Sequence, residues 1–167
     1  YTRSLFPEYA SDAEIYLSAG LMENLSILAH VIFPTKHDLA IIQATNSICV
    51  HCPDATANIT AGIMPLVWLA EQGITIALGS DVGGGHGIPV YRQIARAIQF
   101  SKIKQFYEPE QKRVSLARAF YHATKASGGA FGLVGSFEKG FRFDALVLGG
   151  LNDEGYALAP MERLERF

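Results

Sequence analysis

Three short and almost continuously apolar runs, each followed by a stretch with helical periodicity, constrain the fold of this chain more than any other feature. The runs cover residues 25–29, 47–50 and 74–78. Strands that are apolar on both faces are typical of parallel sheets covered by helices on both sides. The alternation of strand and helix therefore predicts an α/β fold built from βαβ units with right-handed crossovers.

Capping residues and amphipathic patterns place the helices between these runs. Ser11 with Glu14, and Thr35 with Asp38, have the spacing of capping boxes at helix N-termini. Apolar residues recur at helical spacing after each of them and in three later segments. The sequence thus predicts five helices: one that opens at residue 11 and is ended by Gly20, and others over 36–45, 66–72, 91–107 and 116–126.

A change of pattern near residue 131 predicts a domain boundary. Residues 135–140 have the composition of a turn, and residues 143–148 have the pattern of a strand with no crossover helix after it. We therefore divide the chain into residues 1–130, which carry the βαβ units, and residues 131–167, which begin a small β domain.

The composition is that of an ordinary globular domain, with 49% hydrophobic and 18% charged residues and a net charge of -2. It offers neither a basic face for nucleic acid nor an apolar run of about 18 residues for a membrane span. We expect a cytoplasmic protein that binds neither. Cys49 and Cys52 form a C-x-x-C pair, but no second pair accompanies them, which disfavours a redox motif or a structural zinc site.

Each apolar run ends at or just before a polar residue able to do chemistry: His30, His51 and Asp81. In a parallel barrel the C-terminal ends of the strands open on one face, where catalytic residues gather. Taken singly, either histidine could simply bond a loop carbonyl, and Asp81 could cap a turn. Their recurrence at three successive strand ends predicts one shared pocket.

The glycine-rich stretch over residues 79–87 could cradle a phosphate or present Asp81 to a ligand. A P-loop needs G-x-x-x-x-G-K-[ST], and no lysine lies between Lys36 and Lys102. The dinucleotide pattern G-x-G-x-x-G, started at Gly83, fails at Ile88. We therefore expect a turn whose missing side chains let backbone or substrate approach Asp81 closely.

Three motifs resemble those of the amidohydrolase superfamily of metal-dependent (β/α)8 barrels, and the glycine-rich one resembles its guanine deaminase family in particular: Leu28-Ala29-His30, His51-Cys52-Pro53 and Gly79-Ser80-Asp81-Val82-Gly83-Gly84. Downstream, Ala123-Thr124, Gly132-Leu133 and the pattern over residues 135–145 resemble the superfamily's last helix and its return into a small β domain.

This resemblance implies that residues 1–130 are the second half of the barrel, strands 6–8 with their helices, followed by the start of a small C-terminal β domain. It implies that Asp81 binds one catalytic Zn2+ ion and shuttles a proton from its water. His30 would contact that water or the purine substrate, and His51 would line the substrate site. The implied reaction is zinc-dependent hydrolytic deamination of guanine to xanthine and ammonia, by a homodimer.

Two departures from the family pattern accompany the resemblance. The Ser-Asn pair that often follows His-Cys-Pro is absent from residues 54–58, which leaves the substrate open. The first-strand His-x-His and the fifth-strand histidine and glutamate, which supply most metal ligands and the general acid, have no counterpart here.

Three strands cannot close an eight-stranded barrel, and one carboxylate cannot hold a zinc ion. We therefore expect these residues to be completed by more of the same polypeptide or by another chain, and to be inactive alone. The alternatives are another aminohydrolase of the superfamily, acting on cytosine, an oxidised purine or a triazine, and a non-catalytic α/β fragment that binds a partner.

Overall fold

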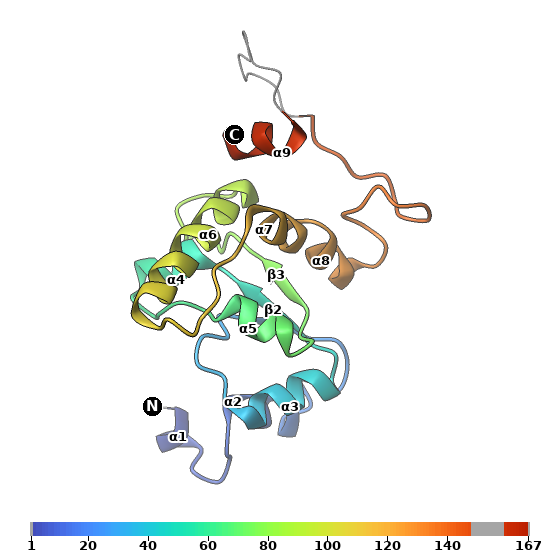
Figure 1. Ribbon diagram of the computed structural model, residues 1–167. Helices are drawn as coiled ribbons and strands as arrows, with labels where there is room; N and C mark the ends of the chain where they lie inside the picture. Colours follow the sequence, from blue (N-terminus) through green and yellow to red (C-terminus); the bar gives the residue numbers. More distant parts are fainter. Residues whose placement is uncertain (1, 148–158, 167) are drawn as a thin grey trace.

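The computed structural model describes residues 2–147 and 159–166, and it is an α/β structure around a small parallel sheet (Figure 1). The elements follow in the order α1 (Thr2–Leu5), α2 (Asp12–Ser18), β1 (Ile27–Ala29), α3 (Lys36–Ala44), β2 (Ile48–His51), α4 (Pro53–Asn58), α5 (Leu66–Glu71), β3 (Ile76–Leu78), α6 (Val90–Tyr107), α7 (Leu116–Ala123), α8 (Lys125–Gly128), η1 (Gly129–Phe131) and α9 (Pro160–Arg166). Within these residues no helix combines the length and hydropathy that a bilayer crossing requires.

The three strands pair in parallel in the order β1-β2-β3, as the apolar runs predict. Val50 lies opposite Ala29 on one side and Ala77 on the other. This register brings the C-terminal ends of all three strands to the same end of the sheet. The core packs between the strands and the helices, with these members among the most buried: Met22, Ile42, Cys49, Leu69, Ile76, Ala97 and Ala119.

Four of the five predicted helices form as single helices, and Ser11 and Thr35 cap α2 and α3 as predicted. Thr35 and Asp38 make a complete capping box at α3, whereas Ser11 accepts the Glu14 N–H at α2 while Glu14 bonds Ala10 instead of closing the box. The sequence patterns did not predict α4, although Pro53 in its first turn is a recognised start signal.

The prediction that residues 25–29 form a buried strand is wrong in its burial. Strand β1 covers Ile27–Ala29, and the side chains of Leu25 and Ile27 are 50% and 53% exposed. Because side chains alternate across a strand, Ile27 and Ala29 point to the face opposite Leu28, and that face is exposed. Among the described residues, β1 also pairs with a strand on one side only.

The predicted helix over 116–126 is interrupted at Thr124, where α7 gives way to α8. The break lets side chains from this segment satisfy the outer edge of β3. His122 Nδ1 donates to the carbonyl of Ile76 at 2.8 Å, and the Leu78 N–H donates to Ser127 Oγ at 3.2 Å. Polar backbone groups at a sheet edge need such partners when they are buried.

The predicted strand over 143–148 does not form in its described part. Residues 142–147 have no regular structure, and residue 148 lies outside the described residues. Phe143, Leu146 and Val147 are almost fully exposed, and an apolar run without a partner strand has nothing to stabilise it as a sheet. The division of the chain at residue 131 stays a prediction.

Asp38 joins α2 to α3, so its replacement tests how this pair of helices is held. One carboxylate oxygen accepts the Ala13 N–H at 3.0 Å, and the other accepts the Thr35 N–H and hydroxyl at 2.8 and 2.6 Å. We expect Asp38→Ala to lower the free energy of unfolding by about 1–3 kcal/mol in urea denaturation. The reason is that the N–H groups of Ala13 and Thr35 would lose their hydrogen-bond acceptor. Thr35→Ser, which keeps the hydroxyl, is the control, and an equal effect of the two variants would contradict this role.

Candidate active site

Asp81 and His30, predicted from separate strand ends, lie side by side. His30 Nε2 is 3.3 Å from Asp81 Oδ2, and the two side chains are 36% and 40% exposed. A carboxylate and an imidazole at this separation can share a proton or bind a common ligand. Their partial exposure leaves the pair accessible from outside the sheet.

The backbone at both residues is in the left-handed region, which non-glycine residues seldom adopt. The φ angles are 58° at His30 and 45° at Asp81. Such conformations cost free energy and persist where the surrounding structure enforces them, most often at functional sites. The hydrogen-bond ladders run up to these turns, since the His30 N–H donates to the Val50 carbonyl and the Gly79 N–H donates to the His51 carbonyl.

His51 is placed differently from the other two. Its side chain is 2% exposed, and its Nδ1 has no hydrogen-bond partner among the described residues. Side chains alternate along a strand, so His51 shares a face with Cys49, which belongs to the core packed against the helices. The structure therefore brings His30 and Asp81 together but buries His51, whose substrate-binding role stays a prediction.

Burial also governs the protonation of His51. Desolvation, together with the nearby His122 and His30, lowers the pKa of His51 to about 3. His122 has a lowered pKa for the same main reason, its burial. Both imidazoles are neutral at physiological pH, because a buried charge without a partner is costly.

The glycines of the loop between β3 and α6 allow close approaches that no side chain would permit. A Cβ on Gly79 would lie 2.8 Å from Val50 Cγ1, and one on Gly84 would lie 2.9 Å from Asp81 Oδ2. A Cβ on Gly85 would overlap the carbonyl oxygen of Ser80. The loop is thus a tight turn packed around Asp81, as expected, and the glycines serve its packing.

Sequence reasoning missed the helix side chains that contact this loop. Asp54 and Asn58, both on α4, hydrogen-bond to His86 and Gly84. They are four residues apart and so lie on one face of a helix. Once α4 is recognised from Pro53, that spacing is the signal that could have identified them.

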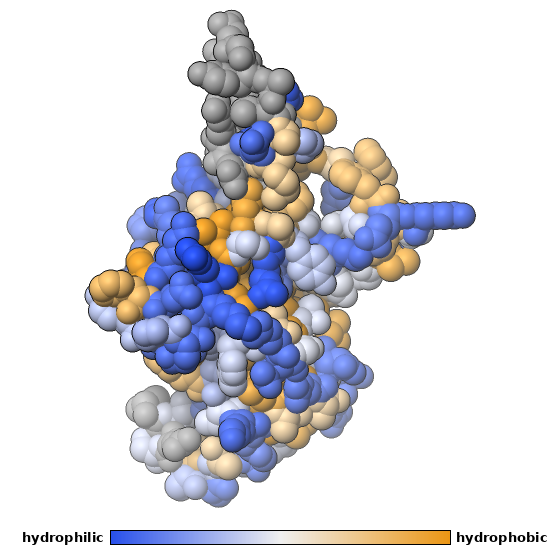
Figure 2. All heavy atoms as spheres, viewed as in Figure 1, coloured by the Kyte–Doolittle hydropathy of each residue, from blue (hydrophilic) through white to orange (hydrophobic). Residues whose placement is uncertain are grey.

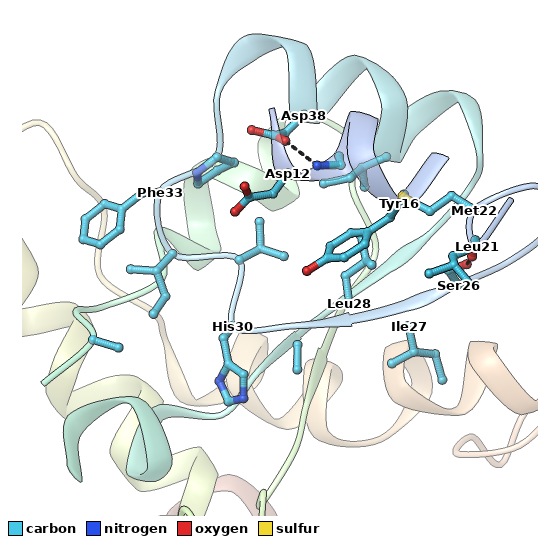
Figure 3. Close-up of a pocket in the computed structure, with 17 residues that line it drawn as sticks. Asp12, Tyr16, Leu21, Met22, Ser26, Ile27, Leu28, His30, Phe33 and Asp38 are labelled. Carbon is cyan, nitrogen blue, oxygen red and sulfur yellow. Dashed lines mark hydrogen bonds between the residues drawn. The ribbon is translucent and has the colours of Figure 1, made fainter. Parts of the chain in front are cut away.

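A cavity of about 820 Å³ lies between β1 and the helices α2 and α3 (Figure 3). Asp12 and Tyr16 line it from α2, Leu28 lines it from the strand, and His30 stands at the end of β1. Because the outer edge of β1 is open, this cavity continues along the exposed strand. His30 is the member of the pair that borders this cavity, and Asp81 does not line it.

A second hollow, of about 640 Å³, lies between α6 and the start of α7. Ile94, Ile98 and Leu116 line it, and Figure 2 shows apolar surface among hydrophilic side chains over this part of the molecule. None of His30, His51 and Asp81 contributes to it. It is separate from the candidate site.

The donor set of the pair fits part of a zinc site. Zinc accepts imidazole nitrogen and carboxylate oxygen, and it needs three or four protein ligands. No group of three or more His, Cys, Asp or Glu side chains among the described residues could hold a metal ion. Asp81 and His30 can therefore supply at most two ligands, and further ligands are needed from elsewhere.

Comparisons with known proteins place these residues in a family context. The model of the amidohydrolase family matches residues 2–166. Guanine deaminase of Mus musculus is 28% identical over 149 residues, which are 87% of this chain and 33% of that protein. The chain thus spans about a third of the length of this curated relative.

Two solved structures are similar to the fold. One is guanine deaminase from C. acetobutylicum with guanine bound in its active site, with a TM-score of 0.92 and 40% identity over 99% of this chain and 40% of that chain. The other is an adenosine deaminase from Xanthomonas campestris with bound zinc, with a TM-score of 0.63 and 18% identity over 75% of this chain and 29% of that one. The second likeness concerns the fold alone.

The packing of the loop predicts that Gly85→Ala destabilises the protein. The new methyl group would overlap the backbone oxygen of Ser80, so the loop must move. We expect a loss of about 1–3 kcal/mol in the free energy of unfolding, measured in urea. Gly129→Ala is the matched control, because nothing lies within 4 Å of its added Cβ and its φ is an ordinary -56°. Equal stability of the two variants would contradict the proposed packing.

The burial of neutral His51 predicts a loss of stability in acid. The unfolded state binds a proton below about pH 6.5, whereas folded His51 resists protonation down to about pH 3. Its contribution is therefore complete above pH 6.5 and is lost as the pH falls, by roughly 3 kcal/mol between pH 7 and pH 4. His51→Gln should flatten this slope of unfolding free energy against pH. An unaltered slope in His51→Gln would refute the assignment.

Proposed function

Because this chain belongs to the amidohydrolase family, we propose that it is the part of a zinc-dependent guanine deaminase that carries the catalytic aspartate. The observation that carries the proposal is the pairing of His30 with Asp81 at two strand ends, 3.3 Å apart, in a chain with this membership. The 40% identity to a guanine-bound guanine deaminase supports guanine as the substrate over other amines.

The three parallel strands are proposed to be strands 6–8 of an eight-stranded barrel. Their order, their common direction and the helices between them are those of consecutive βα units. The open outer edge of β1 is where the preceding strand would pair. In such a barrel the His30–Asp81 pair stands at the C-terminal face, where catalytic groups gather.

In the proposed reaction, water replaces the exocyclic amine of guanine, giving xanthine and ammonia. Asp81 would be a zinc ligand, and His30 lies close enough to Asp81 to contact another ligand of the same ion. When bound, zinc supplies a Lewis acid that makes water nucleophilic near neutral pH.

The residues of this chain would then take part in the proton transfer. A carboxylate oxygen of Asp81 would accept a proton from the attacking water, and the general acid that protonates the departing amine would come from residues outside this chain. His30 Nε2, 3.3 Å from Asp81 Oδ2, would contact the same water or the purine substrate. The remaining zinc ligands and most contacts to the purine belong to residues beyond the pair.

We also propose a homodimer, which sizing chromatography of the full-length protein tests.

The experiment compares the turnover of guanine, cytosine and adenine by the full-length, zinc-loaded protein. We expect xanthine and ammonia from guanine and little product from the others. Preference for another amine would indicate that the protein is a different aminohydrolase of the superfamily. No turnover of any substrate would favour a non-catalytic module.

The Asp81→Asn variant tests the role of the carboxylate. We expect kcat on guanine to fall by at least about 100-fold, because the amide accepts no proton, while circular dichroism stays unchanged. Glu110→Gln removes a carboxylate at an exposed position and is the control. Full activity and full zinc content in Asp81→Asn would rule out the proposed role.

A further inference from the structure

A single buried carboxylate attaches the loop after β3 to two helices. Asp54, in the first turn of α4, is 9% exposed, and its Oδ2 accepts the backbone N–H of His86 at 2.9 Å. The same oxygen lies 3.2 Å from His86 Nδ1, and Oδ1 lies 3.6 Å from Arg96 Nε on α6. Hydrogen bonds to a charged group are stronger than neutral ones, so this contact is suited to fixing the loop.

Asn58 makes a second attachment one turn further along α4. Its Nδ2 donates to the carbonyl of Gly84 at 2.6 Å and lies 3.3 Å from His86 Nδ1. Between these two residues, the methyl group of Ala55 packs against Gly84, where a Cβ would come within 3.2 Å. One face of α4 therefore supports the loop along Gly84, Gly85 and His86.

The same loop residues also contact Asp81. Gly84 lies so close to the Asp81 carboxylate that an added Cβ would be 2.9 Å from Oδ2, the oxygen that faces His30. The Gly85 N–H donates to the Asp81 carbonyl at 2.6 Å. These contacts enforce the left-handed backbone at Asp81, and they are continuous with the contacts to α4.

The charge of Asp54 is maintained despite its burial. The hydrogen bond from the His86 backbone, together with the His86 ring and Arg96, outweighs desolvation and lowers the pKa of Asp54 below its ordinary value. Asp54 is therefore ionised at neutral pH. The contact to His86 is a charge-assisted one under working conditions.

We infer that Asp54 and Asn58 are positioning residues: they hold the loop over residues 82–87 so that the Asp81 carboxylate faces His30. Neither side chain belongs to the His30–Asp81 pair, and both act through Gly84, Gly85 and His86. The inference rests on the proposed function for what Asp81 does, but the attachment itself is a property of the fold.

The test uses the full-length protein with Asp54→Ala, Asp54→Asn and Asn58→Ala. Hydrogen exchange of the amides over residues 82–87 should accelerate at least about tenfold in Asp54→Ala. The kcat on guanine should fall by about 10- to 100-fold with little change in KM, because small displacements of a catalytic group are costly. Asp54→Asn keeps an oxygen that can accept the His86 N–H and should restore part of both quantities.

Ser101→Ala is the matched control. Ser101 is also buried and accepts a backbone N–H from a distant segment, that of Val114 at 2.9 Å, but it does not touch the loop. We expect it to lower the thermal midpoint while leaving loop exchange and kcat as in the wild type. Equal effects of Ser101→Ala and Asp54→Ala on kcat would mean that stability alone is responsible, and would overturn the inference.

The outcomes separate this inference from the proposed function. Unchanged exchange over residues 82–87 in both Asp54→Ala and Asn58→Ala overturns the inference whatever the activity. Faster exchange with wild-type kcat overturns the positioning role. If the wild type itself does not deaminate guanine, the proposed function fails, and the exchange rates alone decide whether Asp54 and Asn58 hold the loop. Asn58→Ala provides the answer if Asp54→Ala does not fold.

Discussion

Parallel pairing of β2 with a strand on each side is the constraint on which the candidate site depends. The register places Val50 between Ala29 and Ala77, and the ladders extend to His30 and Gly79. Because strands in parallel present the same ends to the same edge, residues 51 positions apart in the sequence become neighbours. Without this register, His30 and Asp81 would not lie next to each other.

Close packing of the following loop converts that proximity into a defined geometry. Strand ends alone would leave the side chain of Asp81 free to turn. The glycines at 84 and 85 let the loop fold back onto Asp81, and α4 holds the loop through Asp54 and Asn58. The strained backbone at Asp81 is thus supported by contacts within the loop and from α4, as expected where a functional side chain must be oriented.

Much of this arrangement is predictable from local sequence, and the remainder depends on tertiary contacts. Apolar runs and capping residues such as Thr35 identified the strands and most helices, and strand-end polarity identified His30 and Asp81. Local patterns say nothing of what covers a strand, so the exposure of Ile27 was not foreseen. The burial of His51 follows from side-chain alternation, and the described part of the predicted strand, residues 143–147, has no partner strand among the described residues.

We propose that the loop after β3 places the Asp81 carboxylate where it would bind a zinc ion beside His30. Anomalous diffraction at the zinc edge, from crystals of the full-length, zinc-loaded protein, is the direct test. We expect a peak within bonding distance of an Asp81 oxygen, about 2.0–2.2 Å, at the C-terminal ends of the strands. A zinc peak elsewhere in the protein, or an Asp81 carboxylate turned away from the ion, would contradict it.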